Sequence, residues 1–272
     1  MLIAAGSILA VIAVVVAFVV MQGSSSPSAG NGTAAPSGAT LAGVLGKVTG
    51  VPVATSDKIG AGLATSKPTS ITGAPLVAHG KPEMVYLGAE YCPYCAAERW
   101  AMIVALSRFG TFKGLAPTHS AAKDGAGHAE PFPNTPTWTF AKASFDSKYL
   151  TFTPVEMNTN IPDPATGGYT SLQKPTPAEQ ALLAKYDTAY QGAIPFVDFG
   201  NRYLSVGASY DPTVLAGLTW SQIAGDLHNP DSPVAKSVLG AANYFTAALC
   251  GLTNNRPASA CTPPVRALQG KI

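Results

Sequence analysis

The hydrophobic pattern divides the chain into an apolar N-terminal run, an uncharged segment of small residues, and a long region of mixed character. Residues 2–21 form the apolar run, which holds no charged side chain and one hydroxyl, on Ser7. A helix of about 20 apolar residues spans the hydrocarbon core of a bilayer. The run therefore predicts a transmembrane anchor over residues 1–21. The alternative is a cleaved secretory signal, but no basic residue precedes the run and no Ala-x-Ala site ends it.

The segment after the apolar run has the composition of a tether. Residues 22–40 consist mainly of Gly, Ser, Pro, Ala, Asn and Thr and carry no charge. Such a composition is typical of flexible linkers, because it offers no apolar face to bury. We therefore expect a flexible linker over 22–40 and a folded domain over 41–272, which opens with a short helix at 41–48.

A strand followed by a helix is predicted in the first third of the folded domain. Residues 84–87 (Met-Val-Tyr-Leu) have the character of a short buried strand, and residues 95–109 that of a helix that ends at Gly110. Two further strands are predicted at 137–140 and 149–155, and the segment between them resembles a hairpin connection.

The second half of the domain shows helix starts and a tight turn. Thr-Pro-Ala-Glu at 176–179 is a capping box that predicts a helix to about residue 190. Residues 193–206 predict a hairpin that turns at Gly200-Asn201. Short capping motifs predict helices at 219–227 and 232–250. Strands that alternate with helices in this order indicate an α/β layered domain.

The most informative chemical motif is Cys92-Pro93-Tyr94-Cys95, which lies between the predicted strand and helix. A helix N-terminus presents unpaired N–H groups and a partial positive charge, which favour a thiolate over a thiol. Two thiols two residues apart at that position predict a site that exchanges electrons by forming and breaking a disulfide. An inert structural disulfide and a metal site are the alternatives.

The other two cysteines, Cys250 and Cys261, lie eleven positions apart near the C-terminus. We expect them to form a structural disulfide, because a bridge would hold a C-terminal segment that has no apolar periodicity. Two buried free thiols are the alternative. A zinc site is not expected, because the two cysteine pairs lie more than 150 residues apart.

Charge and the remaining side chains narrow the range of functions. Lys and Arg number 17 and Asp and Glu 15, which leaves a net charge of +2 and no basic cluster, so nucleic acid is not an expected partner. His119 and His128 share a long loop at 114–136 and are expected to be solvated rather than metal ligands. No metal or other cofactor is expected.

The segment at 87–95, Leu-Gly-Ala-Glu-Tyr-Cys-Pro-Tyr-Cys, resembles the active-site region of the thioredoxin superfamily, and its Pro-Tyr dipeptide resembles that of glutaredoxins. The match covers about 82–206. More closely, the chain resembles a family of anchored thioredoxin-like proteins classified as a domain of unknown function. The resemblance implies a thioredoxin-like sheet flanked by helices, with an inserted hairpin region, extra C-terminal helices and an N-terminal transmembrane helix.

The resemblance also implies roles for individual residues. Cys92 would be the more exposed nucleophile and Cys95 the resolving thiol. Ile194-Pro195 matches the position of the cis-proline that lies opposite the CxxC and aims a backbone edge at an incoming substrate, so Ile194 and Tyr94 would contact substrate. Thioredoxins carry a buried Asp six residues before the first Cys, where this chain has Tyr86.

Two side chains near the motif, Glu90 and Arg99, are expected at the solvated surface. The tryptophans at 100, 138 and 220 are expected in the core.

These observations predict a single-pass membrane protein whose catalytic domain lies outside the cytoplasm, because structural disulfides belong to oxidising compartments. The expected function is a thiol–disulfide oxidoreductase that acts on protein thiols or disulfides and is reset by an unidentified redox partner. The alternative is a non-enzymatic thioredoxin-fold binding module whose CxxC is an inert disulfide and whose Pro195 face binds a partner.

Overall fold

A computed structural model describes residues 34–186 and 192–272. The predicted anchor at 1–21 and most of the predicted linker at 22–40 lie outside these residues. The described part of the chain contains no helix that is both long and apolar enough to cross a membrane. Its first helix, α2 (Gly38–Thr49), begins within the last residues of the segment expected to be linker.

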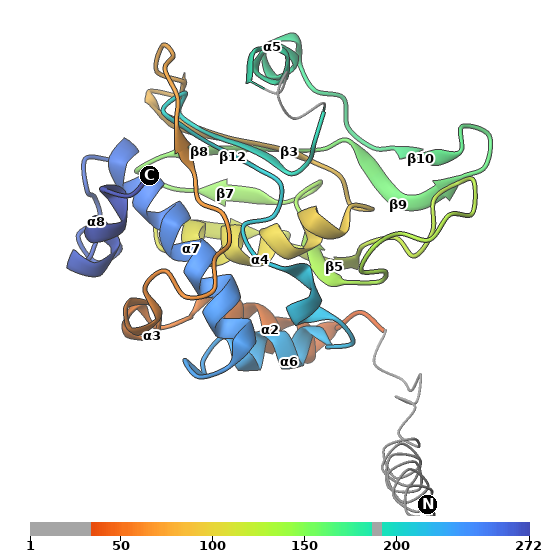
Figure 1. The fold of residues 1–272 in the computed structure, drawn as a ribbon, viewed down its shortest axis with the longest axis horizontal. Helices are drawn as coiled ribbons and strands as arrows, with labels where there is room; N and C mark the ends of the chain where they lie inside the picture. Colours follow the sequence, from red (N-terminus) through yellow and green to blue (C-terminus); the bar gives the residue numbers. More distant parts are fainter. Residues whose placement is uncertain (1–33, 187–191) are drawn as a thin grey trace, which may run out of the picture. The chain divides into compact units, whose positions relative to one another are not determined.

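A six-stranded mixed sheet lies at the centre of the described region (Figure 1). Its central strand is β3 (Lys81–Gly88), whose last five residues are all buried. β3 pairs in parallel with β8 (Thr151–Glu156) and antiparallel with β11 (Phe196–Phe199). The other strands are β12 (Tyr203–Val206) beside β11, β1 (Thr69–Ser70) beside β12, and β2 (Val77–Ala78) beside the start of β3. The strand predicted at 84–87 is therefore confirmed.

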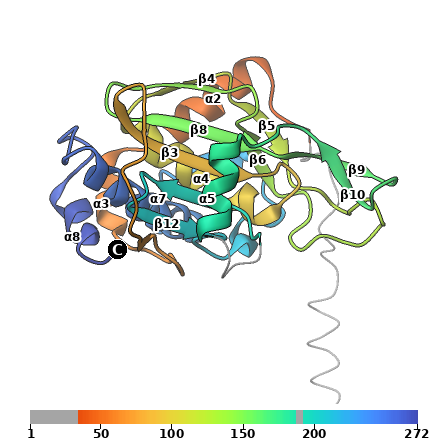
Figure 2. The ribbon, with the colours of Figure 1, turned by 90° about the horizontal axis from the view of Figure 1, so that it is seen from above.

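Successive residues of β3 face opposite sides of the sheet, and helices cover both sides. Met84 and Tyr86 belong to the larger core, with α4 (Pro93–Ser107) and α7 (Pro233–Leu252). Val85 and Leu87 belong to a smaller core under α5 (Pro177–Tyr186). Figures 1 and 2 show α4 and α7 on one face and α5 on the other. The prediction of an α/β sheet flanked by helices is confirmed.

The helix that follows the CxxC motif is a core helix. Cys92 is its N-cap and Pro93 occupies the first helical position, where the missing N–H costs nothing. Almost every residue from Pro93 to Leu106 is buried. A helix that is buried on all sides needs neighbours on all sides, and α4 packs against α7, β6 and α2. The predicted helix is confirmed, and it starts two residues earlier than expected.

The predicted hairpin and its turn are also confirmed. β11 and β12 pair in register from Phe196↔Val206 to Phe199↔Tyr203. Gly200 and Asn201 both adopt positive φ, at 65° and 56°. The register leaves residues 200–202 as a three-residue loop. Its two positive φ values explain the Gly-Asn sequence, because Gly and Asn adopt this left-handed region most readily. The expected helix after Thr176 is observed as α5, and its predicted continuation to 190 lies partly outside the described residues.

The prediction that the strands at 137–140 and 149–155 form a hairpin is wrong. The first segment is β6 (Pro136–Thr139), which pairs with β5 (Ala116–His119) inside the expected long loop, whereas the second is β8 in the central sheet. The reason is packing on α4, because Trp100 Nε1 donates to Pro136 O and Thr137 Oγ1 donates to Ala96 O. The remaining strands of this region are β4 (Thr111–Lys113) with β7 (Ser144–Asp146), and β9 (Asn158–Asp163) with β10 (Gly168–Ser171).

Helices gather on the α4 side of the sheet. They include α6 (Trp220–Asp226), which has the predicted capping box, together with α3 (Val53–Ile59), the 3₁₀ helix η1 (Pro212–Leu215) and α8 (Pro263–Gln269). The sequence did not predict α3 and α8, because each has only seven residues, too few to show a clear helical period. All three tryptophans are core residues, as expected.

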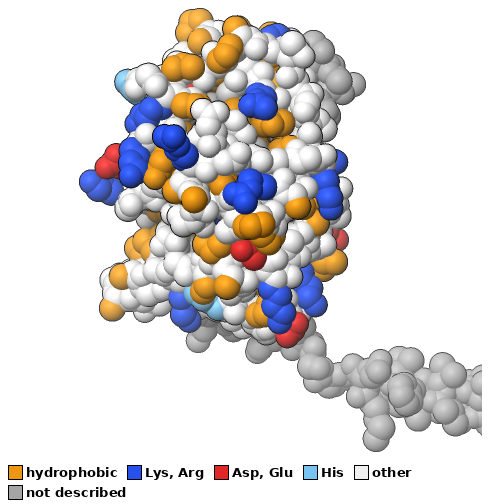
Figure 3. All heavy atoms as spheres, turned by 90° about the vertical axis from the view of Figure 1, so that its left-hand side faces the viewer, with side chains coloured by type: hydrophobic (Ala, Val, Ile, Leu, Met, Phe, Trp, Pro, Cys, Tyr) orange, Lys and Arg blue, Asp and Glu red, His pale blue; other side chains and the backbone are white. Residues whose placement is uncertain are grey.

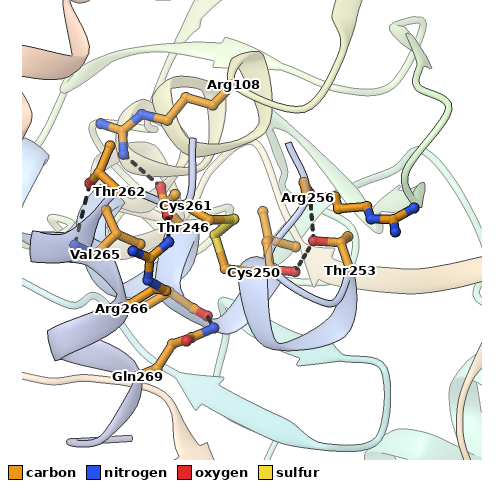
Figure 4. The surroundings of a disulfide bond; sticks show 12 residues. Arg108, Thr246, Cys250, Thr253, Arg256, Cys261, Thr262, Val265, Arg266 and Gln269 are labelled. Atoms are coloured by element: carbon orange, nitrogen blue, oxygen red, sulfur yellow. Dashed lines mark hydrogen bonds between the residues drawn. A yellow bond between two sulfur atoms is a disulfide. The ribbon is translucent and has the colours of Figure 1, made fainter. Parts of the chain in front are cut away.

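The predicted structural disulfide is confirmed, since Cys250 and Cys261 are bonded and both buried (Figure 4). The bond joins the end of α7 to the segment that leads into α8. Hydrogen bonds surround it: Arg266 donates to Cys261 O, and Thr253 donates to Arg256 O. The bridge thus fixes a C-terminal segment that has little regular structure before α8.

Candidate functional site

The two cysteines of the CxxC motif lie at the N-terminus of α4, next to the end of β3. Both are unpaired. Cys92 is the N-cap, and its Sγ accepts the backbone N–H of Cys95 at 3.4 Å. The sulfur therefore takes the place that a Ser or Asp oxygen usually takes at a helix start. This position exposes Cys92 Sγ to the unpaired N–H groups and the partial positive charge of the helix end.

The sheet register brings the Ile194-Pro195 segment to the same place. Phe196, the first residue of β11, pairs with Leu87 near the end of β3. The residues just before β11 therefore lie beside the CxxC loop, and Cys92 Sγ is 3.7 Å from Ile194 O. The Ile194–Pro195 peptide bond is cis. The structure thus brings together Cys92, Cys95, Ile194 and Pro195, four residues that the sequence singles out.

Both sulfurs are less accessible than the sequence suggests. Cys92 is 5% exposed and Cys95 is fully buried, so Cys92 is only slightly the more exposed of the two. Tyr94, between them, is 39% exposed, and its ring lies edge-on against Phe132 with centroids 5.9 Å apart. A substrate sulfur would therefore have to reach a Cys92 side chain that is almost fully buried.

The two thiols differ in ionisation. The pKa of Cys92 is lowered, mainly because the Cys95 thiol donates a hydrogen bond to it and also through backbone N–H groups and the charge of Arg99. The pKa of Cys95 is raised well above its usual value, mainly by burial and then by its interaction with Cys92. Cys92 is therefore the thiol that ionises first.

Arg99 was expected at the solvated surface, and this prediction is wrong. Its side chain is fully buried one turn after Cys95 and forms a two-pronged ion pair with Glu156, with Nε to Oε1 at 2.8 Å and Nη2 to Oε2 at 2.6 Å. Nη2 also donates to Ala89 O. Glu156 ends β8 opposite Gly88, so the parallel β3–β8 pairing places its carboxylate under α4. A buried charge requires such a partner, and the partner lies 57 residues away along the chain.

Tyr86 lies on β3, six residues before Cys92, and its hydroxyl lies close to Cys95. A Cβ built on Gly88 would lie 2.1 Å from Tyr86 Oη and 3.0 Å from Cys95 Sγ, so the two atoms are neighbours across this glycine. Tyr86 Oη is buried and has no hydrogen-bond partner. Burial raises the pKa of Tyr86 well above its usual value, so the hydroxyl keeps its proton.

The region between α4 and α5 packs against the CxxC loop, which the sequence did not predict. Glu90 N donates to Asn158 O and Ala121 N donates to Tyr91 O, each at 2.9 Å. The Tyr91 ring stacks on Tyr169 of β10 with centroids 4.0 Å apart. These contacts explain the low accessibility of Cys92, and they leave Glu90 partly buried rather than fully solvated.

The histidines do not assemble a metal site. His128 is exposed, and its Nδ1 lies 2.9 Å from Asp124 Oδ2. Among the described residues, no group of three or more His, Cys, Asp or Glu side chains is arranged to hold a metal ion.

Two surface features lie away from the CxxC. A hollow of about 340 Å³ lies at the other end of the β11–β12 hairpin, and its lining includes Leu76, Arg202 and Leu252. On the face shown in Figure 3, Lys and Arg side chains are interspersed with hydrophobic and uncharged groups. Neither feature contributes a residue to the site around Cys92.

Comparison with curated proteins gives no significant match, and comparison with solved structures gives none either. The model of one protein family, described as a domain of unknown function (DUF929), matches residues 67–251. This range includes the CxxC motif, the Ile194-Pro195 segment and all six strands of the central sheet. It covers well over half of the chain, and we conclude that the protein belongs to the DUF929 family.

Proposed function

We propose that this protein is a thiol–disulfide oxidoreductase that acts on protein cysteines through Cys92 and Cys95. The observation that carries the proposal is the position of Cys92. Its unpaired sulfur caps α4, accepts the Cys95 N–H, has a lowered pKa and lies 3.7 Å from the Ile194 carbonyl. A thiolate at a helix N-terminus with a second thiol in reach is suited to disulfide exchange.

We further propose that the fold is thioredoxin-like. Three features support this: the CxxC opens a helix directly after a central strand, a parallel strand follows, and Pro195 directly precedes the next core strand, beside the CxxC. In this arrangement Pro195 and Ile194 present a backbone edge beside Cys92, where an extended substrate segment would bind, and Tyr94 would contact it.

The proposed reaction proceeds through a mixed disulfide. The Cys92 thiolate attacks one sulfur of a substrate disulfide, and the other substrate sulfur leaves as a thiolate with the bonding electron pair. The Cys95 thiolate then attacks Cys92 Sγ, and the second substrate sulfur leaves in the same way. The substrate gains two electrons and the protein is left with a Cys92–Cys95 disulfide; in the opposite direction the same steps oxidise a substrate dithiol.

The cellular setting is part of the proposal. The Cys250–Cys261 disulfide supports an oxidising compartment, and the apolar run at 1–21 supports a membrane anchor, so we place the catalytic domain outside the cytoplasm. A separate redox partner would reset Cys92 and Cys95 after each turnover.

The proposal is tested by two single substitutions in assays of insulin reduction and disulfide refolding. Cys92→Ser should abolish turnover, because no nucleophile remains. Cys95→Ser should accumulate a mixed disulfide on Cys92, because the resolving thiol is missing, and mass spectrometry should detect the adduct. Wild-type levels of turnover in both variants would contradict the proposal. Cys250→Ala with Cys261→Ala is the control and should retain turnover at a temperature where it is folded.

A second candidate is a non-enzymatic binding module in which Cys92 and Cys95 form an inert disulfide and the Pro195 face binds a partner. The burial of both sulfurs favours this candidate, since Cys92 is only 5% exposed. The two candidates differ in the rate at which native protein reacts with a thiol reagent after mild reduction. Rapid alkylation of Cys92 supports the enzyme, and alkylation only after unfolding supports the binding module.

A further inference from the structure

Two buried hydrogen-bond donors without acceptors lie near the resolving thiol. The first is the Tyr86 hydroxyl, which neighbours Cys95 Sγ across Gly88 and has no partner. The second is Nη1 of Arg99, which is also buried and unpaired although Nε and Nη2 are both engaged. Leaving a buried donor unsatisfied is costly, and such groups in a native structure call for an explanation.

Tyr86 Oη lies beside Cys95 Sγ, and the Arg99 guanidinium lies beside the Tyr86 ring. Gly88 has no side chain, and a methyl group there would collide with Tyr86 Oη. The Arg99 guanidinium lies 5.8 Å from the centre of the Tyr86 ring, one helical turn beyond Cys95. Its ion pair with Glu156 keeps a positive charge in the interior that burial alone would exclude.

The proposed function requires a negative charge on the Cys95 sulfur for part of each catalytic cycle. Cys95 must be a thiolate when it attacks Cys92 Sγ, and it is the leaving group when a substrate thiolate attacks Cys92 in the reverse reaction. Cys95 is fully buried and has no contact with solvent to stabilise that charge. The charge must therefore be stabilised by protein groups.

Resting on the proposed function, we propose that the Tyr86 hydroxyl is a further catalytic group that donates a hydrogen bond to the Cys95 thiolate, and that Arg99 is a positioning residue that supplies positive charge behind it. The Cys95 proton passes to the substrate thiolate released in the first step. In the resolving step the Cys95 sulfur then forms a bond to Cys92 Sγ, and the second substrate sulfur leaves as a thiolate with the electron pair of the broken bond. The Tyr86 hydroxyl then has an anion to donate to, and the Arg99 charge acts on the same sulfur.

Electrostatics agrees with this assignment. Burial raises the pKa of Cys95, whereas the charge of Arg99 acts to lower it. Burial also raises the pKa of Tyr86, which favours the protonated form of the hydroxyl that can donate. The ionisable groups that interact with Cys95 come from β3, the CxxC loop and α4, and they are Tyr86, Tyr91, Cys92 and Arg99. Glu156 of β8 acts on Tyr86 and Arg99.

The test follows release of nitrothiobenzoate from its symmetrical aromatic disulfide by the reduced full-length protein in detergent. Attack by Cys92 releases one equivalent, and resolution by Cys95 releases a second. In Tyr86→Phe we expect the second phase to slow about tenfold at neutral pH and its pH midpoint to rise by about one unit, because a hydrogen bond to a charged sulfur is lost. The first phase should stay within about twofold of wild type.

The control is Tyr210→Phe, which removes a hydroxyl from an equally buried tyrosine that donates to Ala97 O on the same helix. It should lower stability and leave the second-phase midpoint unchanged. A double variant, Arg99→Met with Glu156→Gln, removes the charge together with its partner and should raise the same midpoint.

An unchanged second phase in Tyr86→Phe, or an equal slowing of both phases, would overturn the inference while the proposed function stands. No first-phase release from native wild-type protein would instead contradict the proposed function itself. Thermal unfolding shows whether each variant is folded, and Tyr86→Phe should melt no lower than wild type, because the hydroxyl it removes has no partner.

Discussion

Glu98 and Arg99 are consecutive residues of α4, and both side chains are fully buried. Their surroundings differ. Arg99 has a carboxylate partner. Glu98 has none, and it accepts hydrogen bonds only from the backbone N–H and hydroxyl of Ser209, at 3.0 and 2.6 Å. Burial therefore raises the pKa of Glu98 to about 7, and the hydrogen bonds from Ser209 only partly offset this. The folded protein holds this carboxyl in its neutral form below about pH 7.

This difference predicts a pH dependence of stability. Since the folded pKa of Glu98 lies above its ordinary value of 4.5, the unfolded state loses the proton first as pH rises. The free energy of unfolding should therefore fall by about 3 kcal/mol between pH 4.5 and pH 7 because of this group. Glu98→Gln should remove this part of the slope, as measured by urea unfolding across that range. An unchanged slope would show that Glu98 is ionised in the folded protein.

The buried ion pair gives a second prediction at the residue scale. Arg99→Met should lower the free energy of unfolding by about 3–5 kcal/mol, because it leaves Glu156 buried without a partner. Adding Glu156→Gln should recover a large part of that loss. Urea unfolding of both variants at neutral pH measures the difference. If the double variant were as unstable as the sum of the two single variants, the two side chains would not act as a pair.

At the residue scale, the sequence predicts which residues carry the proposed chemistry better than it predicts which side chains are buried. Cys92, Cys95 and Pro195 are recognisable from their neighbours, because the motif and the helix start are local signals. The burial of Arg99 is not, since it depends on Glu156 at the end of a strand that follows a long inserted region. The unpaired hydroxyl of Tyr86 is equally invisible, because it depends on the absence of a side chain at Gly88 in the folded state.

At the scale of elements, the sequence predicts local turns, caps and the β11–β12 hairpin correctly, but it does not predict which strand pairs with β6. Gly200-Asn201 specifies its turn through two positive φ values, and Thr219 caps α6 with Gln222 as predicted. The partner of β6 could not be predicted, because β5 was hidden in a loop rich in proline. Strand pairing is a long-range property, and proximity along the chain suggested the wrong neighbour for β6.

The disulfide between the end of α7 and the segment before α8 predicts a stability effect. Replacing Cys250 and Cys261 together by Ala should lower the free energy of unfolding by about 3 kcal/mol, because the unfolded chain regains the freedom of a closed loop. Hydrogen exchange should speed up mainly in α8 and the residues before it, with little change in β3. Unchanged unfolding midpoints in denaturant would show that the bridge is not a stabilising element.

At the scale of the whole described domain, the central sheet brings distant segments to one point. The end of β3 carries the CxxC, the start of β11 carries Pro195, and the end of β8 carries Glu156. The region between α4 and α5 then packs over this point through Asn158 and Tyr169. The two thiols therefore lie at the edge of a packed interior, differ in pKa, and have little exposure to solvent.

The central claim is that Cys92 and Cys95 exchange electrons with substrates, and their redox equilibrium tests it most directly. The full-length protein is equilibrated in a series of thiol/disulfide buffers, alkylated and measured by mass spectrometry, with the Cys250–Cys261 bridge as an internal reference that should stay oxidised. We expect the Cys92–Cys95 pair to titrate between about −120 and −270 mV, as catalytic pairs do. A potential below about −300 mV would contradict the claim and identify the pair as a structural disulfide.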